Sequence, residues 1–322
     1  FIGQHATLTL PLEAVQAWGP GHPTLYDLTL TLDALGGRDV VQSYFGLRSV
    51  ALSDHAILFN GKPLFQRLVL DQGFYPDGVY TAPSDEALRC DIEISQGLGF
   101  NGARLHQKLF EPRFLYWADR LGYLVWDEFP NWGLDIRDAK ALAVFAPQWL
   151  EAMRRDYSHP SLVGWCPFNE TPPDQDPTVV QTIYRLTKAL DRTRPVIDAS
   201  GYQHVETDIY DVHNYEQDTA RFASFFAPMA AGGEPFRNRP ELDAPYRGQP
   251  YFVSEYGGIW WNPQQSDDRG WGYGGVAGRP RSENEFLARY RQLTETLLRH
   301  PRMCALCYTQ LYDVEQDVNG LY

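Results

Sequence analysis

The stretch "SLVGWCPFNETPP" (161–173) sets the organisation of this chain. An apolar run with the length of a buried strand, 162–168, stops abruptly at Asn169 and Glu170. Two prolines follow shortly, which prevents a helix from beginning at once. Burying a carboxylate is costly unless it is paired, so we expect a functional site where this strand leaves the core.

Apolar strand-like runs alternate with amphipathic helical runs on both sides of this stretch. The expected strands are 64–70, 100–106, 122–128, 162–168, 195–200, 208–213, 250–255 and 303–310. The expected helices are 84–98, 112–121, 145–157, 177–191 and 283–299, with Ser84 and Ser282 as N-caps and Pro112 in a first turn. Eight strands with helices between most of them predict an α/β fold, a (β/α)8 TIM barrel. It occupies 53–322, and we expect it to lack its last helix because none follows the eighth strand.

The first 52 residues have a different pattern. The segments 5–12, 24–33 and 38–52 alternate or run apolar in short pieces, with glycine- and proline-rich turns between them. They predict three antiparallel strands, whereas a sandwich of the immunoglobulin kind needs about seven. We therefore expect this segment to be the end of a domain.

Composition excludes several classes of protein. The chain has 322 residues, of which 43% are hydrophobic, and a net charge of −13 that argues against nucleic acid and anionic membranes as partners. No run approaches the roughly 18 apolar residues of a membrane span. Cys304 and Cys307 are three apart in an apolar strand, so they face opposite sides, and no metal or cofactor is expected. A homo-oligomer and the compartment both stay open.

Ionisable and polar residues gather where the predicted strands end. In a barrel of this type the chemistry sits at the carboxyl ends of the strands. The residues at these ends are Arg104 and His106, Asp127 and Glu128, Asn169 and Glu170, His213 and Tyr215, and Glu255. A purely structural protein would have little reason to place charges there.

Two carboxylates stand out, Glu170 after the fourth strand and Glu255 after the seventh. Glycoside hydrolysis uses two such groups, one as proton donor and one as nucleophile, with their pKa values pushed apart. Arg104 and nearby tyrosines suit an ionised Glu255. The apolar neighbours at 165–168 suit a protonated Glu170, although alternate residues of a strand face opposite ways.

Four segments resemble glycoside hydrolase family 2, the family of β-galactosidases, β-glucuronidases and β-mannosidases. "HPSLVGWCPFNE" (159–170) is similar to the acid/base signature of that family, and "YFVSEYGG" (251–258) to its nucleophile segment. "GFNGARLHQ" (99–107) and "LGYLVWDE" (121–128) resemble its second and third strands. The first 52 residues are similar to the end of its immunoglobulin-like β-sandwich domain, here incomplete.

The resemblance implies a retaining mechanism. Carried over position by position, Glu170 is the acid/base and Glu255 the nucleophile. Asn169 would bind the 2-hydroxyl of the sugar, and Arg104 would hold Glu255 ionised.

Further residues are candidates for binding the sugar. His213 and Tyr215 would line the site of the sugar that is cleaved off, the −1 site. Trp260 and Trp261 follow the seventh strand and would stack on sugar faces. Tyr308 is a further candidate, in place of a tryptophan that usually closes the −1 site.

His106, Asp127 and Glu128 are weighed between two roles. Each could contact substrate, and each could be scaffold, the two acids by pairing with Arg104. Sequence alone leaves both readings open.

The substrate expected from this pattern is a carbohydrate, a neutral galactoside-like sugar removed from a chain end. Glucuronidases of the family carry an N-x-K-G motif, and "DVNG" (317–320) has Asn319 where the lysine would stand. Losing that cation counts against a uronic acid. Two alternatives are kept: a carbohydrate-binding protein without turnover, and an endo-acting polysaccharide hydrolase.

Overall fold

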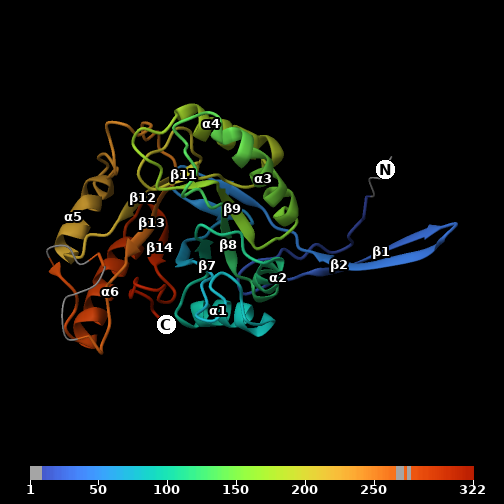
Figure 1. Ribbon diagram of the computed structural model, residues 1–322, viewed down its shortest axis with the longest axis horizontal. Helices are drawn as coiled ribbons and strands as arrows, with labels where there is room; N and C mark the ends of the chain where they lie inside the picture. Colours follow the sequence, from blue (N-terminus) through green and yellow to red (C-terminus); the bar gives the residue numbers. More distant parts are fainter. Residues whose placement is uncertain (1–8, 266–271, 274–276) are drawn as a thin grey trace.

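The computed structural model describes residues 9–265, 272–273 and 277–322 (Figure 1). Its centre is a curled sheet of seven parallel strands in the order β12-β13-β14-β6-β7-β8-β9. Their bounds are β6 Gln66–Asp71, β7 Gly102–Leu105, β8 Leu124–Glu128, β9 Leu162–Cys166, β12 Tyr210–Asn214, β13 Tyr251–Gly257 and β14 Met303–Thr309. The last strand pairs with the first, β14 with β6, as the barrel prediction requires.

The fifth predicted strand is the exception. Of 195–200, only β11 (Ala199–Ser200) is a strand, and it pairs with β10 (Phe168–Asn169) rather than with the seven-stranded sheet. No ladder in the described part of the chain joins β11 to β12. The chain turns away at Gly201, whose φ of 66° is left-handed and whose Cα faces the His213 ring. The TIM-barrel prediction is therefore confirmed as a curled sheet, with one interrupted side.

Helices cover the outer face of the sheet (Figure 1). Their bounds are α1 Asp85–Gly97, α2 Pro112–Leu121, α3 Ala141–Asp156, α4 Pro177–Leu190, α5 Thr219–Ala230 and α6 Glu283–Leu298. Ser84 and Ser282 cap α1 and α6 by accepting backbone N–H bonds, and Pro112 opens α2, as predicted. The sequence analysis did not single out α5, although Phe222, Phe225 and Phe226 follow the spacing of one buried helix face. None of the described helices is both long and apolar enough to cross a membrane.

Two apolar cores lie on the two sides of the sheet. Alternate strand residues enter different cores: Leu70 and Trp126 face the barrel interior, while Val69 and Val125 face the helices. This alternation is a property of any strand, since successive side chains point to opposite faces. The same alternation determines which groups at the strand ends face the barrel interior.

The amino-terminal segment forms two small antiparallel sheets. β1 (Tyr26–Ala34) and β2 (Gly37–Phe45) make a hairpin that projects from the body (Figure 1). β3 (Val50–Leu52), β4 (Ile57–Phe59) and β5 (Lys62–Pro63) make a second sheet. The predicted strand 38–52 is thus two strands. The predicted strand 5–12 is wrong for residues 9–12, which form no strand, and residues 5–8 lie outside the described residues.

Gly102 tests how tightly neighbouring strands approach. A Cβ at this position would lie 2.4 Å from the carbonyl oxygen of Leu124, a backbone atom of the paired strand β8. We predict that Gly102→Ala lowers the free energy of unfolding by about 1–3 kcal/mol, because the strands must move apart. Urea unfolding measures the change.

Gly97→Ala is the matched control, because nothing lies within 4 Å of a Cβ there. It should leave the unfolding midpoint unchanged or slightly higher, since alanine restricts the unfolded chain. Equal midpoints for Gly102→Ala and the unmodified chain would contradict the close approach of β7 and β8.

Candidate active site

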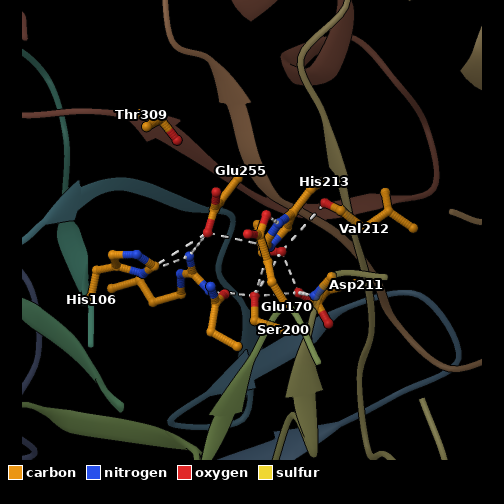
Figure 2. Close-up of polar contacts among 12 residues, drawn as sticks. His106, Glu170, Ser200, Asp211, Val212, His213, Glu255 and Thr309 are labelled. Carbon is orange, nitrogen blue, oxygen red and sulfur yellow. Dashed lines mark hydrogen bonds and ion pairs between the residues drawn. The ribbon is translucent and has the colours of Figure 1, made fainter. Parts of the chain in front are cut away.

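The polar strand ends meet in one cluster at the carboxyl end of the sheet (Figure 2). Each of its members comes from the end of a different strand or from the residue that follows it. They are Arg104 of β7, Glu128 of β8, Asn169 of β10 with Glu170 after it, Ser200 of β11, His213 of β12 and Glu255 of β13. Parallel strands bring their carboxyl ends to one edge, which is why residues up to 151 positions apart are in contact.

Arg104 is the centre of the cluster and is fully buried. Its Nη2 forms an ion pair with Oε1 of Glu255, and its Nη1 lies 3.1 Å from Oε2 of Glu128. Nη1 also donates to Oδ1 of Asn169, at 3.0 Å, and to the hydroxyl of Ser200. Burial would lower the pKa of Arg104, but the two glutamates raise it well above its usual value. The guanidinium therefore stays charged and fixes both carboxylates.

Glu255 receives hydrogen bonds on both oxygens. Besides Arg104 on Oε1, the hydroxyl of Tyr215 donates to Oε2. Tyr215 is itself held by Thr309, whose hydroxyl lies 3.0 Å away, and by the ring of Tyr273, stacked at 3.6 Å. The carboxyl group of Glu255 is therefore held in one orientation by donors on both of its oxygens.

Glu170 lies beside His213 rather than among apolar side chains. Its Oε1 is 2.8 Å from Nδ1 of His213, and Tyr202 also hydrogen-bonds to it. Burial would raise the pKa of Glu170, but the hydrogen bond and charge of His213 outweigh it and lower the pKa. The expectation that apolar neighbours keep Glu170 protonated is therefore wrong: Trp165 and Phe168 point outward and pack on Trp149 and Phe145 of α3.

His213 joins the two glutamates. Its Nε2 lies 3.0 Å from the hydroxyl of Ser200 and 3.4 Å from Oε1 of Glu255. Ser200 donates its single proton to Asp211, at 2.8 Å, and so accepts from Nε2. Both ring nitrogens then carry protons. Burial would lower the pKa of His213, but the charge of Glu255 and the bond to Glu170 raise it.

Glu170, His213 and Glu255 each offer one ligand atom, and these atoms lie within 4.8 Å of one another. Such a group could hold a metal ion. Here the charges are already balanced, because Arg104 contacts Glu255 and both nitrogens of His213 are hydrogen-bonded. The same distance means that one carboxylate oxygen of each glutamate can reach the same bond of a bound substrate.

His106 and Glu128 support the cluster from one side. Nδ1 of His106 lies 3.2 Å from Oε1 of Glu128 and 4.0 Å from Glu255. Burial alone would raise the pKa of Glu128, and the charge of Arg104 lowers it. Next to His106 lies Trp132, at 5.3 Å between ring centroids, with 59% of its surface exposed. Trp132 offers an aromatic face at the mouth of the barrel.

Asp127 does not belong to the cluster, although it neighbours Glu128 in sequence. It faces the helix side of β8, where its carboxyl group lies near that of Asp156 of α3. Burial, with the charge of Asp156 added, raises its pKa well above the usual value. The alternation of the strand sends one of two adjacent acids to each face.

Three aromatic candidates also lie away from the glutamates. Tyr308 is fully buried between β14 and α6, where its ring contacts Tyr256 and Tyr290. Trp261 packs on Phe286 of α6. Trp260 is 9% exposed and lies under Arg279. No contact recorded among the described residues joins these three to Glu170 or Glu255, so their predicted role in stacking a sugar gains no support.

Sequence reasoning missed several residues that the structure brings to the site. Ser200 ends the fifth strand, so the strand-end rule could have found it. Thr309 and Tyr202 gave no signal, because uncharged residues at loop positions are common. Asp211 is inside a strand, and only the folded register shows that it accepts from Ser200.

The site is thus a pair of carboxylates on a TIM barrel, positioned by one arginine. The family description "Glycosyl hydrolases family 2, TIM barrel domain" matches residues 50–263, and "Glycosyl hydrolases family 2" matches residues 2–48. The chain belongs to this family of glycoside hydrolases, as its sequence indicates.

Relatives in the family include enzymes with different sugars in their names. "Beta-galactosidase 2" of Enterobacter cloacae is 30% identical over 220 residues, covering 64% of this chain and 21% of that protein. A Felis catus beta-glucuronidase is 31% identical over 205 residues, covering 56% of this chain and 30% of that protein. The chain therefore spans well under half the length of these relatives.

Solved structures confirm the fold. A beta-D-glucuronidase from Dictyoglomus thermophilum superposes with a TM-score of 0.76 at 20% identity, over 92% of this chain and 52% of that chain. A beta-galacturonidase from Eisenbergiella tayi, solved with galacturonate, gives 0.74 over 95% of this chain and 54% of its own.

Arg104 can be tested without any assay of activity. We predict that Arg104→Met lowers the free energy of unfolding by about 3–5 kcal/mol at neutral pH, because it leaves buried carboxylates unpaired. In the unmodified chain the pKa of Glu128 is lowered by Arg104, so its stabilising contribution is present at neutral pH and lost as pH falls. The deficit of the variant should therefore shrink between pH 7 and about pH 3, that is, once pH falls below the usual glutamate pKa of about 4.3.

Urea unfolding at both pH values measures this, with Arg113→Met as control. Arg113 forms an exposed pair with Asp85, so its loss should change little. A deficit for Arg104→Met that is small, or that grows in acid, would show that the arginine does not neutralise the cluster.

Proposed function

We propose that this protein is a retaining exo-β-glycosidase acting by double displacement on a neutral, galactoside-like sugar. The observation that carries the proposal is the pair Glu170 and Glu255, with ligand oxygens within 4.8 Å. Retaining enzymes hold their two carboxyl groups about 5–5.5 Å apart, whereas inverting enzymes need roughly 6.5–9.5 Å to admit a water. The short separation supports direct attack by a carboxylate.

In the first step, Glu255 attacks the anomeric carbon of the sugar. Arg104 and Tyr215 hold its carboxylate ionised and aimed. As the bond from carbon to the leaving oxygen breaks, that oxygen takes the proton shared by Glu170 and His213. A glycosyl ester on Glu255 results, and the leaving group departs as a neutral alcohol.

In the second step, water replaces the leaving group. Glu170, now without its proton, accepts one from the water while the oxygen attacks the same carbon. The ester bond breaks, Glu255 is released as a carboxylate, and the sugar keeps its β configuration. His213 stabilises the ionised state of Glu170 that accepts this proton, because its Nδ1 lies 2.8 Å from Oε1 of Glu170.

Charge at the sugar site supports a neutral substrate. Arg104 is already neutralised by Glu128 and Glu255. Burial raises the pKa of Asp317, and the charge of His106 offsets only part of this rise. Because the two charges interact, the carboxyl group of Asp317 lies near the site. Asn319 is buried, with its Oδ1 held by Gln310 at 2.8 Å. A sugar carboxylate would meet an acid here, and Asn169 would instead bind a hydroxyl.

We also propose that residues 1–52 are the end of an immunoglobulin-like β-sandwich and that 53–322 are the catalytic barrel. The hairpin of β1 and β2 supports the first part, because side chains on both of its faces are largely exposed and its strands pair with no other described strand. The two family matches meet between residues 48 and 50, near the proposed boundary.

A panel of nitrophenyl β-glycosides tests the activity. Release of nitrophenol from the galactoside, and none from the glucuronide, is the expected result. A carbohydrate-binding protein without turnover would release none, and an endo-acting hydrolase would cleave polymers only. Either of these two outcomes would contradict the proposed exo-glycosidase activity.

Glu170→Ala separates the two steps. Nitrophenolate leaves without a proton, so formation of the ester should suffer little, whereas a sugar leaving group should react about 10²–10⁴-fold more slowly. Azide needs no base and should restore turnover of the aryl glycoside as a β-glycosyl azide, seen by mass spectrometry. Equal slowing of aryl and sugar substrates, with no azide product, would exclude Glu170 as acid/base.

The pH dependence of kcat/KM tests the role of His213. Its pKa is raised, so the Glu170–His213 pair keeps its proton up to a pH above the usual histidine value of about 6.5 and loses it as pH rises further. In His213→Gln the proton must sit on Glu170 alone, and the basic limb should move down by a unit or more.

His159→Gln is the control for this comparison, because His159 bonds to Asp119, outside the catalytic cluster. Its basic limb should match that of the unmodified chain. A basic limb unmoved in His213→Gln would mean that His213 does not share the catalytic proton.

A further inference from the structure

Arg239 lies next to the acid/base glutamate but outside the catalytic cluster. Its Nη1 donates to the backbone oxygen of Thr171, the residue after Glu170, at 3.0 Å. Its guanidinium carbon lies 4.7 Å from the ring centroid of Tyr202. Tyr202 in turn hydrogen-bonds to Glu170. The arginine therefore packs against the two elements that hold the acid/base residue.

This arginine carries a charge without a counter-charge. Within residues 9–265, 272–273 and 277–322, no carboxylate lies within ion-pair distance of Arg239, although its side chain is half-buried. Arg155 and Arg194, by contrast, pair with Asp156 and Asp191 at 2.7 and 2.6 Å. A partly buried guanidinium without a carboxylate partner is suited to bind an anion.

Tyr202 adds a second feature of a binding site. Its φ of 58° is in the left-handed region, which is uncommon and strained for a bulky residue. The strained loop holds the ring against Arg239, with its centroid 5.7 Å from that of His213. The ring is half-exposed, so it offers an aromatic surface beside Glu170.

The position of these two residues identifies the side of the bond that they face. Glu170 protonates the oxygen between the sugar and its leaving group, while Glu255 attacks the sugar carbon. Arg239 and Tyr202 make their contacts with Thr171 and Glu170, and they form no bond to Glu255 among the described residues. They lie with the proton donor, which is the side from which the leaving group departs.

We propose that Arg239 and Tyr202 form the leaving-group subsite and that it recognises a leaving group bearing a carboxylate or a sulfate. Arg239 would pair with the anion, and Tyr202 would stack on the ring that carries it. The inference rests on the proposed glycosidase function and refines its substrate: a neutral sugar linked to an acidic one. The sugar site repels an acid, and the leaving-group subsite attracts one.

Matched aryl β-glycosides test this subsite. The leaving group is a nitrophenol that bears a carboxylate, a sulfonate or, as the neutral reference, a carboxamide at the same ring position. We expect the unmodified chain to prefer the charged groups by about tenfold in kcat/KM, the scale of one charged hydrogen bond. The better of the two anions indicates whether a carboxylate or a sulfate is the natural group.

Substitutions at Arg239 test whether this arginine causes the preference for charged leaving groups. In Arg239→Met the ratio of charged to neutral substrate should fall to about one, and Arg239→Lys should keep part of the preference. Arg247→Met removes an exposed arginine of the same loop and should leave the ratio unchanged. An unchanged ratio in Arg239→Met, or equal losses on charged and neutral substrates, overturns the subsite.

A failure of the glycosidase proposal looks different. No substrate of any kind would then release nitrophenol. Calorimetric titration of the carboxylated and carboxamide glycosides into the unmodified chain and Arg239→Met decides that case. A preference for the carboxylate that Arg239→Met abolishes retains the anion site without hydrolysis, whereas equal affinities overturn the site as well.

Discussion

One buried arginine holds the site together. Arg104 contacts Glu255, Glu128 and Asn169 from the end of β7, so it fixes three other strand ends relative to its own. Removing a guanidinium from water is costly, and the two glutamates offset that cost only if the strands keep their register. The geometry of Glu255 and the closure of the sheet thus depend on the same interaction. A scaffold that shifted by one residue would place these charges in apolar surroundings.

The interrupted side of the barrel shapes the surroundings of Glu170. Where β11 ends, the chain turns through Gly201 and Tyr202 in left-handed conformations, and Glu170 opposite is left-handed as well. These turns bring Tyr202 and His213 to Glu170. If β11 and β12 were paired by regular hydrogen bonds, backbone atoms would occupy this region instead. Strain at such residues is held by the surrounding structure and is typical of functional sites. A loss of regular pairing here accompanies a gain in side-chain contacts at Glu170.

The strand-end rule predicted much of this from sequence, and its failures share a cause. Arg104, Glu170, His213 and Glu255 could be placed because parallel strands end at one edge. Asp127 could not, because which of two adjacent residues faces inward depends on a register that only the fold sets. The protonation of Glu170 could not be foreseen either, since His213 approaches it from 43 residues away. The strands of the amino-terminal segment were predicted only in part. Packing, rather than the alternating sequence pattern, determines where such short strands end.

Covalent labelling of Glu255 tests the central claim most directly. A 2-deoxy-2-fluoro-β-glycoside with a dinitrophenyl leaving group destabilises the second transition state and traps the ester formed in the first step. Mass spectrometry of the intact chain and of its peptides should show one fluoroglycosyl group, on the peptide that contains Glu255. A label on any other residue, or turnover of substrate to the α anomer without an adduct, would contradict the account.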